Sequence, residues 1–156
     1  MTRRLIHYSR EPLAVVRSVE QDVVQSRKPN GLWVSAEGDD DWKRWCSLDE
    51  DFRPENLLCE SEVTVRPGAR VLTVQTVEEL DAFNLSYSAD YFGQGEAIDW
   101  REVARRWQGI VIAPYQWERR LSLGWYYPWD CASGCFWDAD AVGFRHHTVF
   151  MPSRSG

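Results

Sequence analysis

The sequence predicts one α+β domain, in which split, mixed β-sheets and two or three helices surround a binding cleft. Strand-like segments come first along the chain, two helical segments stand between strands in the middle, and strand-like segments return at the end. No internal repeat or low-complexity linker divides the chain, whose 156 residues match one ordinary domain. This order favours an α+β fold over a regular βαβ repeat.

The chain begins with short strand-like segments. Residues 3–8 (RRLIHY) form the first expected strand, whereas the valines of residues 11–25 fit either a strand or a helix. The turn at 28–31 (KPNG) leads into an expected strand at 32–35 (LWVS). The acidic turn at 38–41 (GDDD) can cap a helix. One face of that helix carries Trp42, Trp45 and Cys46 at helical spacing.

Two more strands and a capped helix follow. Residues 60–66 (ESEVTVR) alternate like a strand, and residues 70–74 (RVLTV) form another. Thr76 with Glu79 matches a capping box, in which the two side chains bond backbone N–H groups that the first helical turn leaves free. The helix that opens there is expected to run through about Tyr87.

The last part of the chain is expected to contain one more helix and two more strands. Asp99 with Glu102 is a second capping box, which opens a helix over 99–108 that Gly109 ends. The apolar run at 110–113 (IVIA) then fits a buried central strand. The remaining expected segments are a loop at 88–97, an irregular aromatic stretch at 114–135, a last strand at 135–142 and a frayed tail at 152–156.

Composition limits the partners and the location that can be expected. The chain carries 24 acidic against 18 basic residues, a net charge of −6, which repels phosphate backbones and anionic membranes at long range. A protein or small-molecule partner is therefore favoured over nucleic acid, and no membrane partner is expected. Because no apolar stretch could span a bilayer or serve as a signal peptide, a cytoplasmic location with four free thiols is expected.

His7, Tyr8 and Ser9 form the first candidate ligand-binding segment, at the end of the first expected strand. Taken alone, the three residues are explained most simply by a structural hydrogen bond of His7 at a strand end, since such short matches often mislead.

The second candidate segment is the strand at 32–35 with the helix that follows it. This pair can be a core strand packed on an amphipathic helix, or it can form a flat aromatic slot. Two indole faces can sandwich a planar ring, and a cationic ring gains cation–π attraction as well. Nine tryptophans exceed what a core of this size needs, which favours a slot or an interface. The candidate residues here are Gly31, Leu32, Trp33, Ser35, Trp42 and Trp45.

In this order the two segments resemble the start of the ADP-ribosyltransferase fold of diphtheria toxin and the poly(ADP-ribose) polymerases. In that family, a His followed by a small polar residue ends an early strand, and a Gly-hydrophobic-aromatic strand and a helix with a second aromatic come next. The resemblance covers about the first third of the chain and implies that NAD is bound. It implies that His7 and Ser9 hold the adenosine ribose, that Trp33 stacks on nicotinamide near Ser35, and that Trp45 closes the sandwich. Both aromatics are usually Tyr in the family.

The family usually completes its site with a Glu near the start of a late strand. That acid bonds the nicotinamide-side ribose and stabilises an oxocarbenium-like transition state. No Glu stands there in this chain, so Asp130 is the preferred acid and Glu118 the alternative. Each has a simpler role as well, since Asp130 can form a turn and Glu118 can pair with Arg119 or Arg120.

Two other kinds of chemistry use the cysteines. Cys131 and Cys135 with His146 and His147 supply ligand types for zinc, although adjacent histidines in a strand point to opposite faces. A cysteine nucleophile activated by a histidine is a further alternative. Neither pattern is specific, and no metal is expected.

The resemblance therefore implies an NAD-dependent ADP-ribosyltransferase that cleaves the nicotinamide–ribose bond, with His7, Trp45 and Asp130 as its catalytic residues. The acceptor cannot be read from the residues. One alternative is a non-catalytic interaction domain of the same fold, because Tyr and Trp also dominate protein interfaces. Another is an RNA 2′-phosphotransferase-like enzyme, which would need basic residues such as Arg119 and Arg120.

Overall fold

The structure is a computed structural model that describes residues 2–22, 27–48, 57–90 and 95–149, the last four of them by their backbone alone. The strands are β1 (Leu5–Ser9), β2 (Leu32–Ala36), β3 (Cys59–Val65), β4 (Val71–Val74), β5 (Gly109–Ile112), β6 (Ser133–Phe136) and β7 (Val142–Val149). The helices are α1 (Trp42–Ser47), α2 (Val77–Tyr87) and α3 (Trp100–Arg106), with 3₁₀ turns η2 (Trp117–Arg119) and η3 (Ala139–Ala141).

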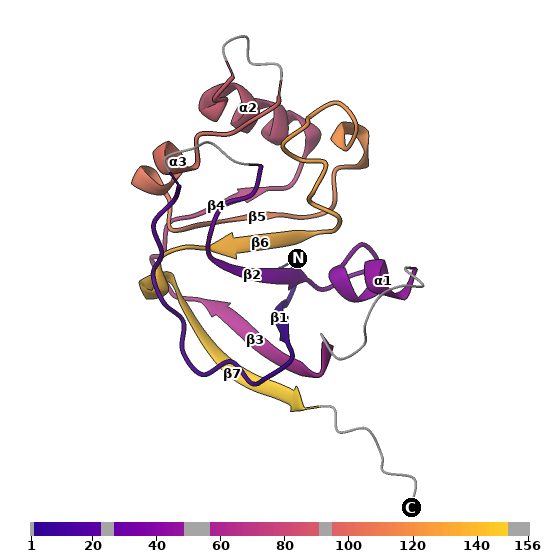
Figure 1. Cartoon of the computed structure of the whole chain (residues 1–156), viewed down its shortest axis with the longest axis vertical. Coiled ribbons are helices and arrows are strands. Elements are labelled where there is room, and N and C mark those ends of the chain that lie inside the picture. The colour runs from indigo at the N-terminus through magenta and orange to yellow at the C-terminus, as the bar shows by residue number, and fades with distance from the viewer. Residues whose placement is uncertain (1, 23–26, 49–56, 91–94, 150–156) are drawn as a thin grey trace, which may run out of the picture.

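The described strands form one curled sheet of seven strands in the order β4-β5-β6-β2-β1-β3-β7, shaped like half a barrel (Figure 1). Only β4 and β5 run parallel; the other neighbours are antiparallel. The predicted single α+β domain is confirmed, but the predicted split into separate sheets is wrong. The sheet is continuous because β1 pairs with β2 at two positions, Leu5 with Ala36 and Ile6 with Ser35.

Most predicted elements are confirmed to within two residues, and the differences lie mainly in the second half. The last strand predicted at 135–142 is two strands, because Asp138 accepts a bond from the Asp140 N–H and caps a 3₁₀ turn between them. Gly109 begins β5 instead of ending α3, which stops at Arg106. The described part of 11–25 forms neither strand nor helix. The tail at 152–156 lies outside the described residues.

The predicted helix caps are confirmed by hydrogen bonds. The Asp41 carboxylate accepts from the Arg44 N–H at 2.8 Å, which starts α1. The Thr76 hydroxyl accepts from the Glu79 N–H at 3.1 Å, and α3 is capped in the same way by Asp99. Each cap pairs one N–H that the first helical turn cannot use.

Many of the tryptophans are buried in the core, although their number had suggested a slot or an interface. Trp100, Trp125, Trp129 and Trp137 are each less than 5% exposed and pack with α2 and α3 against the β4-β5-β6 part of the sheet. The aromatic composition therefore reflects the core as much as any slot.

All four cysteines are buried free thiols, as predicted. No helix in the described ranges is long and apolar enough to cross a bilayer.

Candidate functional site

A cavity of about 200 Å³ opens beside the point where β1 and β2 separate. The β1–β2 ladder stops at Ile6 and Ser35, whereas the pairing of β1 with β3 continues from His7 to Ser9. The cavity therefore lies where β1 and β2 separate within the sheet. Six of the residues predicted for the site line it, from β1, β2, α1 and the chain before β6: His7, Tyr8, Trp33, Ser35, Trp42 and Asp130.

His7 is held at the cavity wall by a hydrogen bond across the parted strands. Its Nδ1 lies 2.7 Å from the backbone oxygen of Trp33. A carbonyl can only accept, so Nδ1–H is the donor, and in the neutral ring Nε2 is left as an acceptor. This is the structural hydrogen bond that a strand-end His suggests, and it also orients an acceptor suited to a ribose hydroxyl.

Trp33 is half-buried and forms one wall of the cavity. Trp129 packs against it with ring centroids 4.8 Å apart at 71°, an edge-to-face contact that fixes the indole. The Lys28 ammonium lies 5.0 Å from the centroid of the same ring. The Trp33 ring therefore already binds a cation in this structure.

The helix α1 contributes Trp42 to the cavity, and not Trp45. The Ser35 hydroxyl accepts from the Trp42 N–H at 2.9 Å, which places the first residue of the helix directly beside β2. Trp45, one turn later, faces the Arg120 guanidinium at 5.0 Å from its ring centroid. The predicted pair of Trp33 and Trp45 is thus replaced by Trp33 and Trp42 as the tryptophans of these two elements that line the cavity.

Asp130 lies at the cavity wall and is paired with Arg120. Their closest side-chain atoms are 3.4 Å apart, and Asp130 remains about one-third exposed. Arg120 donates to the Tyr115 hydroxyl at 2.7 Å and also packs against the ring of Tyr127. Burial alone would lower the pKa of Arg120, but the bond to Tyr115 and the Asp130 charge outweigh it and raise that pKa. Arg120 therefore holds a permanent positive charge against Asp130.

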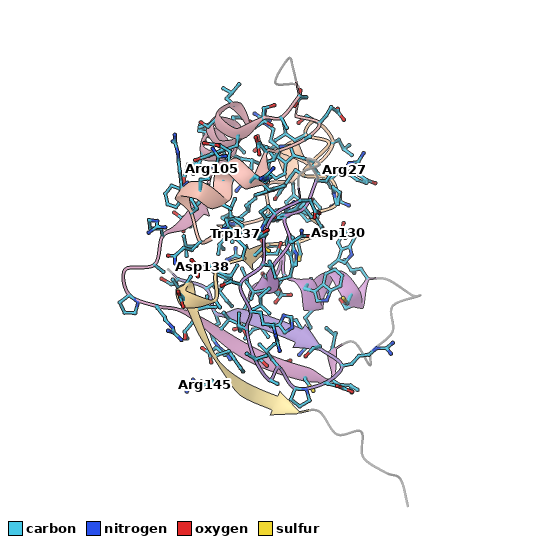
Figure 2. All side chains as sticks on the ribbon, turned by 60° about the vertical axis from the view of Figure 1, so that its left-hand side comes forward. Arg27, Arg105, Asp130, Trp137, Asp138 and Arg145 are labelled. Carbon is cyan, nitrogen blue, oxygen red and sulfur yellow. The ribbon has the colours of Figure 1, made fainter. Side chains whose placement is uncertain are left out.

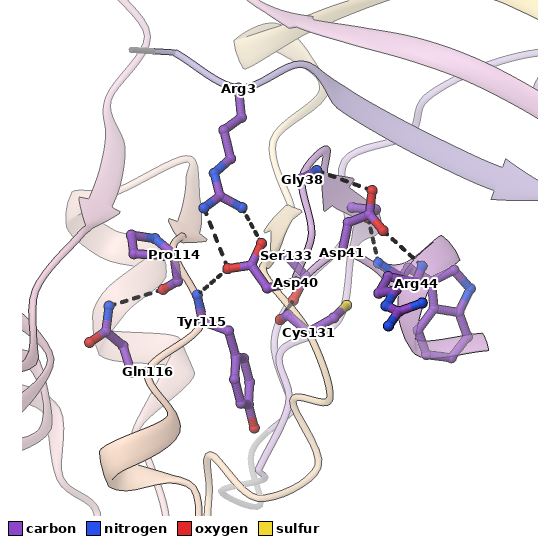
Figure 3. Close-up of polar contacts among 12 residues, drawn as sticks. Arg3, Gly38, Asp40, Asp41, Arg44, Pro114, Tyr115, Gln116, Cys131 and Ser133 are labelled. Carbon is purple, nitrogen blue, oxygen red and sulfur yellow. Dashed lines mark hydrogen bonds and ion pairs between the residues drawn. The ribbon is translucent and has the colours of Figure 1, made fainter. Parts of the chain in front are cut away.

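The acidic turn before α1 ties this helix to the chain that carries Asp130. Asp40 forms an ion pair with Arg3 and accepts from the Tyr115 N–H at 2.8 Å, as Figure 3 shows. Its backbone oxygen accepts from the Ala132 N–H at 2.8 Å. One residue of the turn thus fastens three separate segments and brings α1 and Asp130 to the same cavity.

The other predicted residues lie near the cavity without lining it, as far as the described residues extend. The Ser9 hydroxyl donates to the Glu11 carbonyl at 2.6 Å, and Leu32 packs in the smaller apolar cluster on the sheet. Gly31 has φ +155° and lies so close to Phe136 that a Cβ would be 2.5 Å from the backbone oxygen of that residue. Glycine is therefore required at this position by the approach of the neighbouring strand.

Glu118, the alternative acid, is exposed on η2 and is not among the described lining residues. The arginines beside it pair elsewhere, Arg119 with Asp81 and Arg120 with Asp130. The salt bridge suggested for Glu118 is therefore wrong, and Asp130 is the one acid on the described cavity wall.

Sequence reasoning missed Lys28 as a cavity residue. It included Trp129 only as a member of the aromatic stretch 126–137, which could either pack a long loop or form a cleft wall. Lys28 belongs to the turn before β2. The sequence predicted this turn, but a turn pattern does not show which way the Lys28 side chain points. Trp129 directly precedes Asp130, and its indole N–H donates to the Arg27 carbonyl at 3.2 Å. Figure 2 accordingly shows Asp130 and Arg27 on the same side of the molecule.

Tyr8 adds a polar atom to the cavity wall in an acidic setting. Burial, followed by the negative charges of Glu60, Asp41 and Glu37, raises the pKa of the Tyr8 phenol above its usual range. The phenol therefore stays protonated at all ordinary pH values. The same acids favour a cation over an anion at this end of the cavity.

Comparison with protein-family models, with curated proteins and with solved structures finds no match. Any function must therefore be argued from the cavity itself.

The cysteines beside the cavity lack the surroundings of a nucleophile. Burial raises the pKa of Cys131 to about 12 and moves that of Cys135 further above its usual range. A thiolate is scarce under these conditions, whereas catalytic cysteines have lowered pKa values. For zinc, no group of three suitable side chains occurs among those that the structure describes, which do not include His146 and His147.

We expect Cys131 to resist alkylation in the native protein. Because its pKa is raised by about three units, the thiolate fraction at pH 8 falls about a thousandfold, since each unit is a factor of ten. Iodoacetamide labelling followed by mass spectrometry should find Cys131 unmodified at pH 8 and modified after unfolding in guanidinium. Rapid labelling of Cys131 in the native protein would contradict this expectation and would support the hypothesis of a cysteine nucleophile.

Proposed function

We propose that the protein is an NAD-dependent ADP-ribosyltransferase that cleaves the nicotinamide–ribose bond. The observation that carries the proposal is the single cavity that gathers His7, Trp33, Trp42 and Asp130 from four separate segments. At about 200 Å³ the cavity suits one planar ring and its attached sugar edge, so most of a dinucleotide would lie along the surface outside it.

The charges around the cavity support a cationic ring as the part that enters. Trp33 already holds an ammonium group over its ring, and the Asp130 carboxylate stands on the same wall. Nicotinamide carries a positive charge in NAD and loses it on leaving. Aromatic faces and a carboxylate therefore suit the bound substrate better than the departing product.

In the proposed reaction, the bond between the ribose C1′ and the nicotinamide nitrogen breaks, and its electron pair leaves with neutral nicotinamide. Positive charge develops on the ribose, and in this proposal the Asp130 carboxylate on the cavity wall stabilises that charge. An acceptor hydroxyl, amine or water then forms a new bond to C1′ and releases a proton. His7 Nε2 is available to bind a ribose hydroxyl, because Nδ1 is committed to Trp33.

The RNA 2′-phosphotransferase alternative is less well supported. Arg119 and Arg120, the basic pair on which it relied, are not among the described residues that line the cavity, and Arg119 is paired with Asp81. The interaction-domain alternative has one observation in its favour, a set of exposed apolar side chains between β5 and β6. These are Trp117 (60% exposed), Leu121 (86%) and Tyr127 (50%).

We expect NAD to quench tryptophan fluorescence and to raise the melting temperature by mass action. At a concentration one hundred times Kd, the stabilisation is about 2.7 kcal/mol. Trp33→Ala should weaken NAD binding by about tenfold or more, because the stacking face is lost. Trp117→Ala is the matched control, since Trp117 is exposed and outside the cavity. An unchanged signal at millimolar NAD would refute the proposal.

A further inference from the structure

The strand β4 forms one edge of the sheet, next to α2 and α3 in Figure 1. The Val74 carbonyl accepts from the Ala113 N–H at 3.1 Å and therefore faces the neighbouring strand β5. Successive residues of a strand direct their main-chain groups to opposite sides, so those of Val71 and Thr73 face outward. Among the described strands, none pairs with this outer side of β4.

The β4 edge lacks the features that usually keep the edges of sheets from pairing, which are charged side chains, proline and bulges. Residues 71–74 (VLTV) contain no charge and no proline, and all four pair with β5 in regular register. The opposite described edge, β7, carries Arg145, and its pairing with β3 shifts register between Glu60 and Ser61. Of these two edges, β4 is therefore the better suited to accept another strand.

A groove of about 260 Å³ lies beside β4, between this strand and α2. Leu72 and Trp107 line it, together with Glu79, Ala82 and Ser86 from one face of α2. Because Ala82 and Ser86 are small, α2 leaves room beside the edge for the side chains of an added strand. Leu72 gives the groove an apolar surface that such side chains can cover.

The two ends of β4 carry opposite charges. Arg70 directly precedes the strand, and its Nε donates to the Arg106 carbonyl at 3.0 Å, which places both arginines at this end. The Arg70 charge also helps to lower the pKa of Asp138, after the bond from Gln108. Glu79 follows the strand in the first turn of α2. An antiparallel copy of the same strand would place the basic end of each copy beside the acidic end of the other, whereas a parallel copy would oppose like charges.

We propose that two copies of this chain pair through β4, antiparallel and about a two-fold axis, to form one continuous sheet. Val71 of each copy lies opposite Thr73 of the other and exchanges main-chain hydrogen bonds with it, and the two Leu72 side chains meet at the axis. Arg70 of each copy lies beside Glu79 of the other. This inference goes beyond the proposed function and does not depend on it, because no residue of β4 or α2 lines the cavity that contains His7.

The first test measures the oligomeric state and the protection of the edge. Sedimentation equilibrium from low to high micromolar concentration should show a reversible dimer, and hydrogen exchange at the N–H groups of Val71 and Thr73 should slow as the dimer forms. Thr73→Pro removes an outward N–H and leaves the bonds to β5 in place, so it should raise the dimer Kd about tenfold or more. A wild-type protein that stays monomeric at every concentration would overturn the proposal.

The second test exchanges the charges at the two ends of the strand. Glu79→Arg and Arg70→Glu should each raise the dimer Kd about tenfold or more, because like charges then face each other. Mixed in equal amounts, the two variants should form a heterodimer, since every arginine at the interface again meets a glutamate. Glu78→Arg is the matched control, because Glu78 belongs to the same helical turn but is not among the described lining residues of the groove. It should leave the Kd within about twofold.

The recovery on mixing separates this interface from damage to the fold, because a misfolded variant is not rescued by another. If Glu79→Arg and Arg70→Glu remain monomeric when mixed, although thermal unfolding shows both folded, the antiparallel pairing of β4 is refuted. An equal loss of the dimer in Glu78→Arg would also refute it, since the effect would then reflect net charge and not this interface.

Discussion

Asp130→Asn should lower the rate of nicotinamide release from NAD by about a hundredfold to a thousandfold, the usual loss when one electrostatic stabiliser of a transition state is removed. NAD affinity should change much less, because the charge that Asp130 would stabilise appears on the ribose as the bond breaks. The substitution keeps the size of the side chain and its contact with the Arg120 guanidinium, while the negative charge is lost. The measurement is nicotinamide release at saturating NAD, with and without cell extract to supply an acceptor.

Two matched variants show whether the effect belongs to Asp130 itself. Glu118→Gln removes an equivalent charge from an exposed position outside the cavity and should leave the rate within twofold, as surface substitutions generally do. His7→Ala should raise the NAD concentration needed for half the maximal rate, with a smaller loss at saturation. Wild-type turnover in Asp130→Asn together with inactivity in Glu118→Gln would show that the acid is wrongly assigned. If the wild-type protein binds NAD but releases no nicotinamide, the enzyme hypothesis is refuted and the interaction-domain alternative is supported.

The part of the site that could be predicted depends on local patterns on neighbouring strands. His7 and Trp33 come together because β1 and β2 are adjacent, and Asp130 joins them because β6 pairs with β2 over Ser133 to Phe136. The sequence indicated β1 and β2, and it indicated the end of β6 only as the start of the strand expected at 135–142, with Asp130 as the acid before it. Strand pairing then brings the three side chains to one cavity.

The misplaced residues depend on contacts between segments far apart in the chain. Trp42 and Trp45 lie on one face of a six-residue helix, and helical spacing cannot say which of them reaches the cavity. The choice is made by the bond from the Trp42 N–H to Ser35 and by Arg120, which packs on Trp45 from 75 residues away. The continuous sheet was missed for a similar reason, since two residue pairs between β1 and β2 join its halves.

Trp129→Ala should produce the largest loss of stability, about 3–5 kcal/mol in the free energy of unfolding, as expected when a fully buried large aromatic is truncated. Trp129 is 1% exposed and packs against Trp33, Trp100 and Trp125, with ring centroids 4.8 to 6.1 Å apart. Its removal leaves a void beneath Trp33 and deprives the Arg27 carbonyl of the indole donor. The cavity wall and the turn that carries Lys28 are both weakened.

Urea unfolding followed by circular dichroism measures this loss, with two variants for comparison. Trp117→Ala truncates an indole that is 60% exposed and contacts Tyr115 edge-to-face at 4.5 Å, so it should cost about 1 kcal/mol. Trp129→Phe keeps an aromatic ring but not the N–H, and should lie between the other two. A cost below 1 kcal/mol for Trp129→Ala would contradict its place in the core. If Trp129→Ala is destabilised as expected but binds NAD with wild-type affinity below its melting temperature, Trp129 supports the fold alone, and the Trp33 ring does not depend on it for binding.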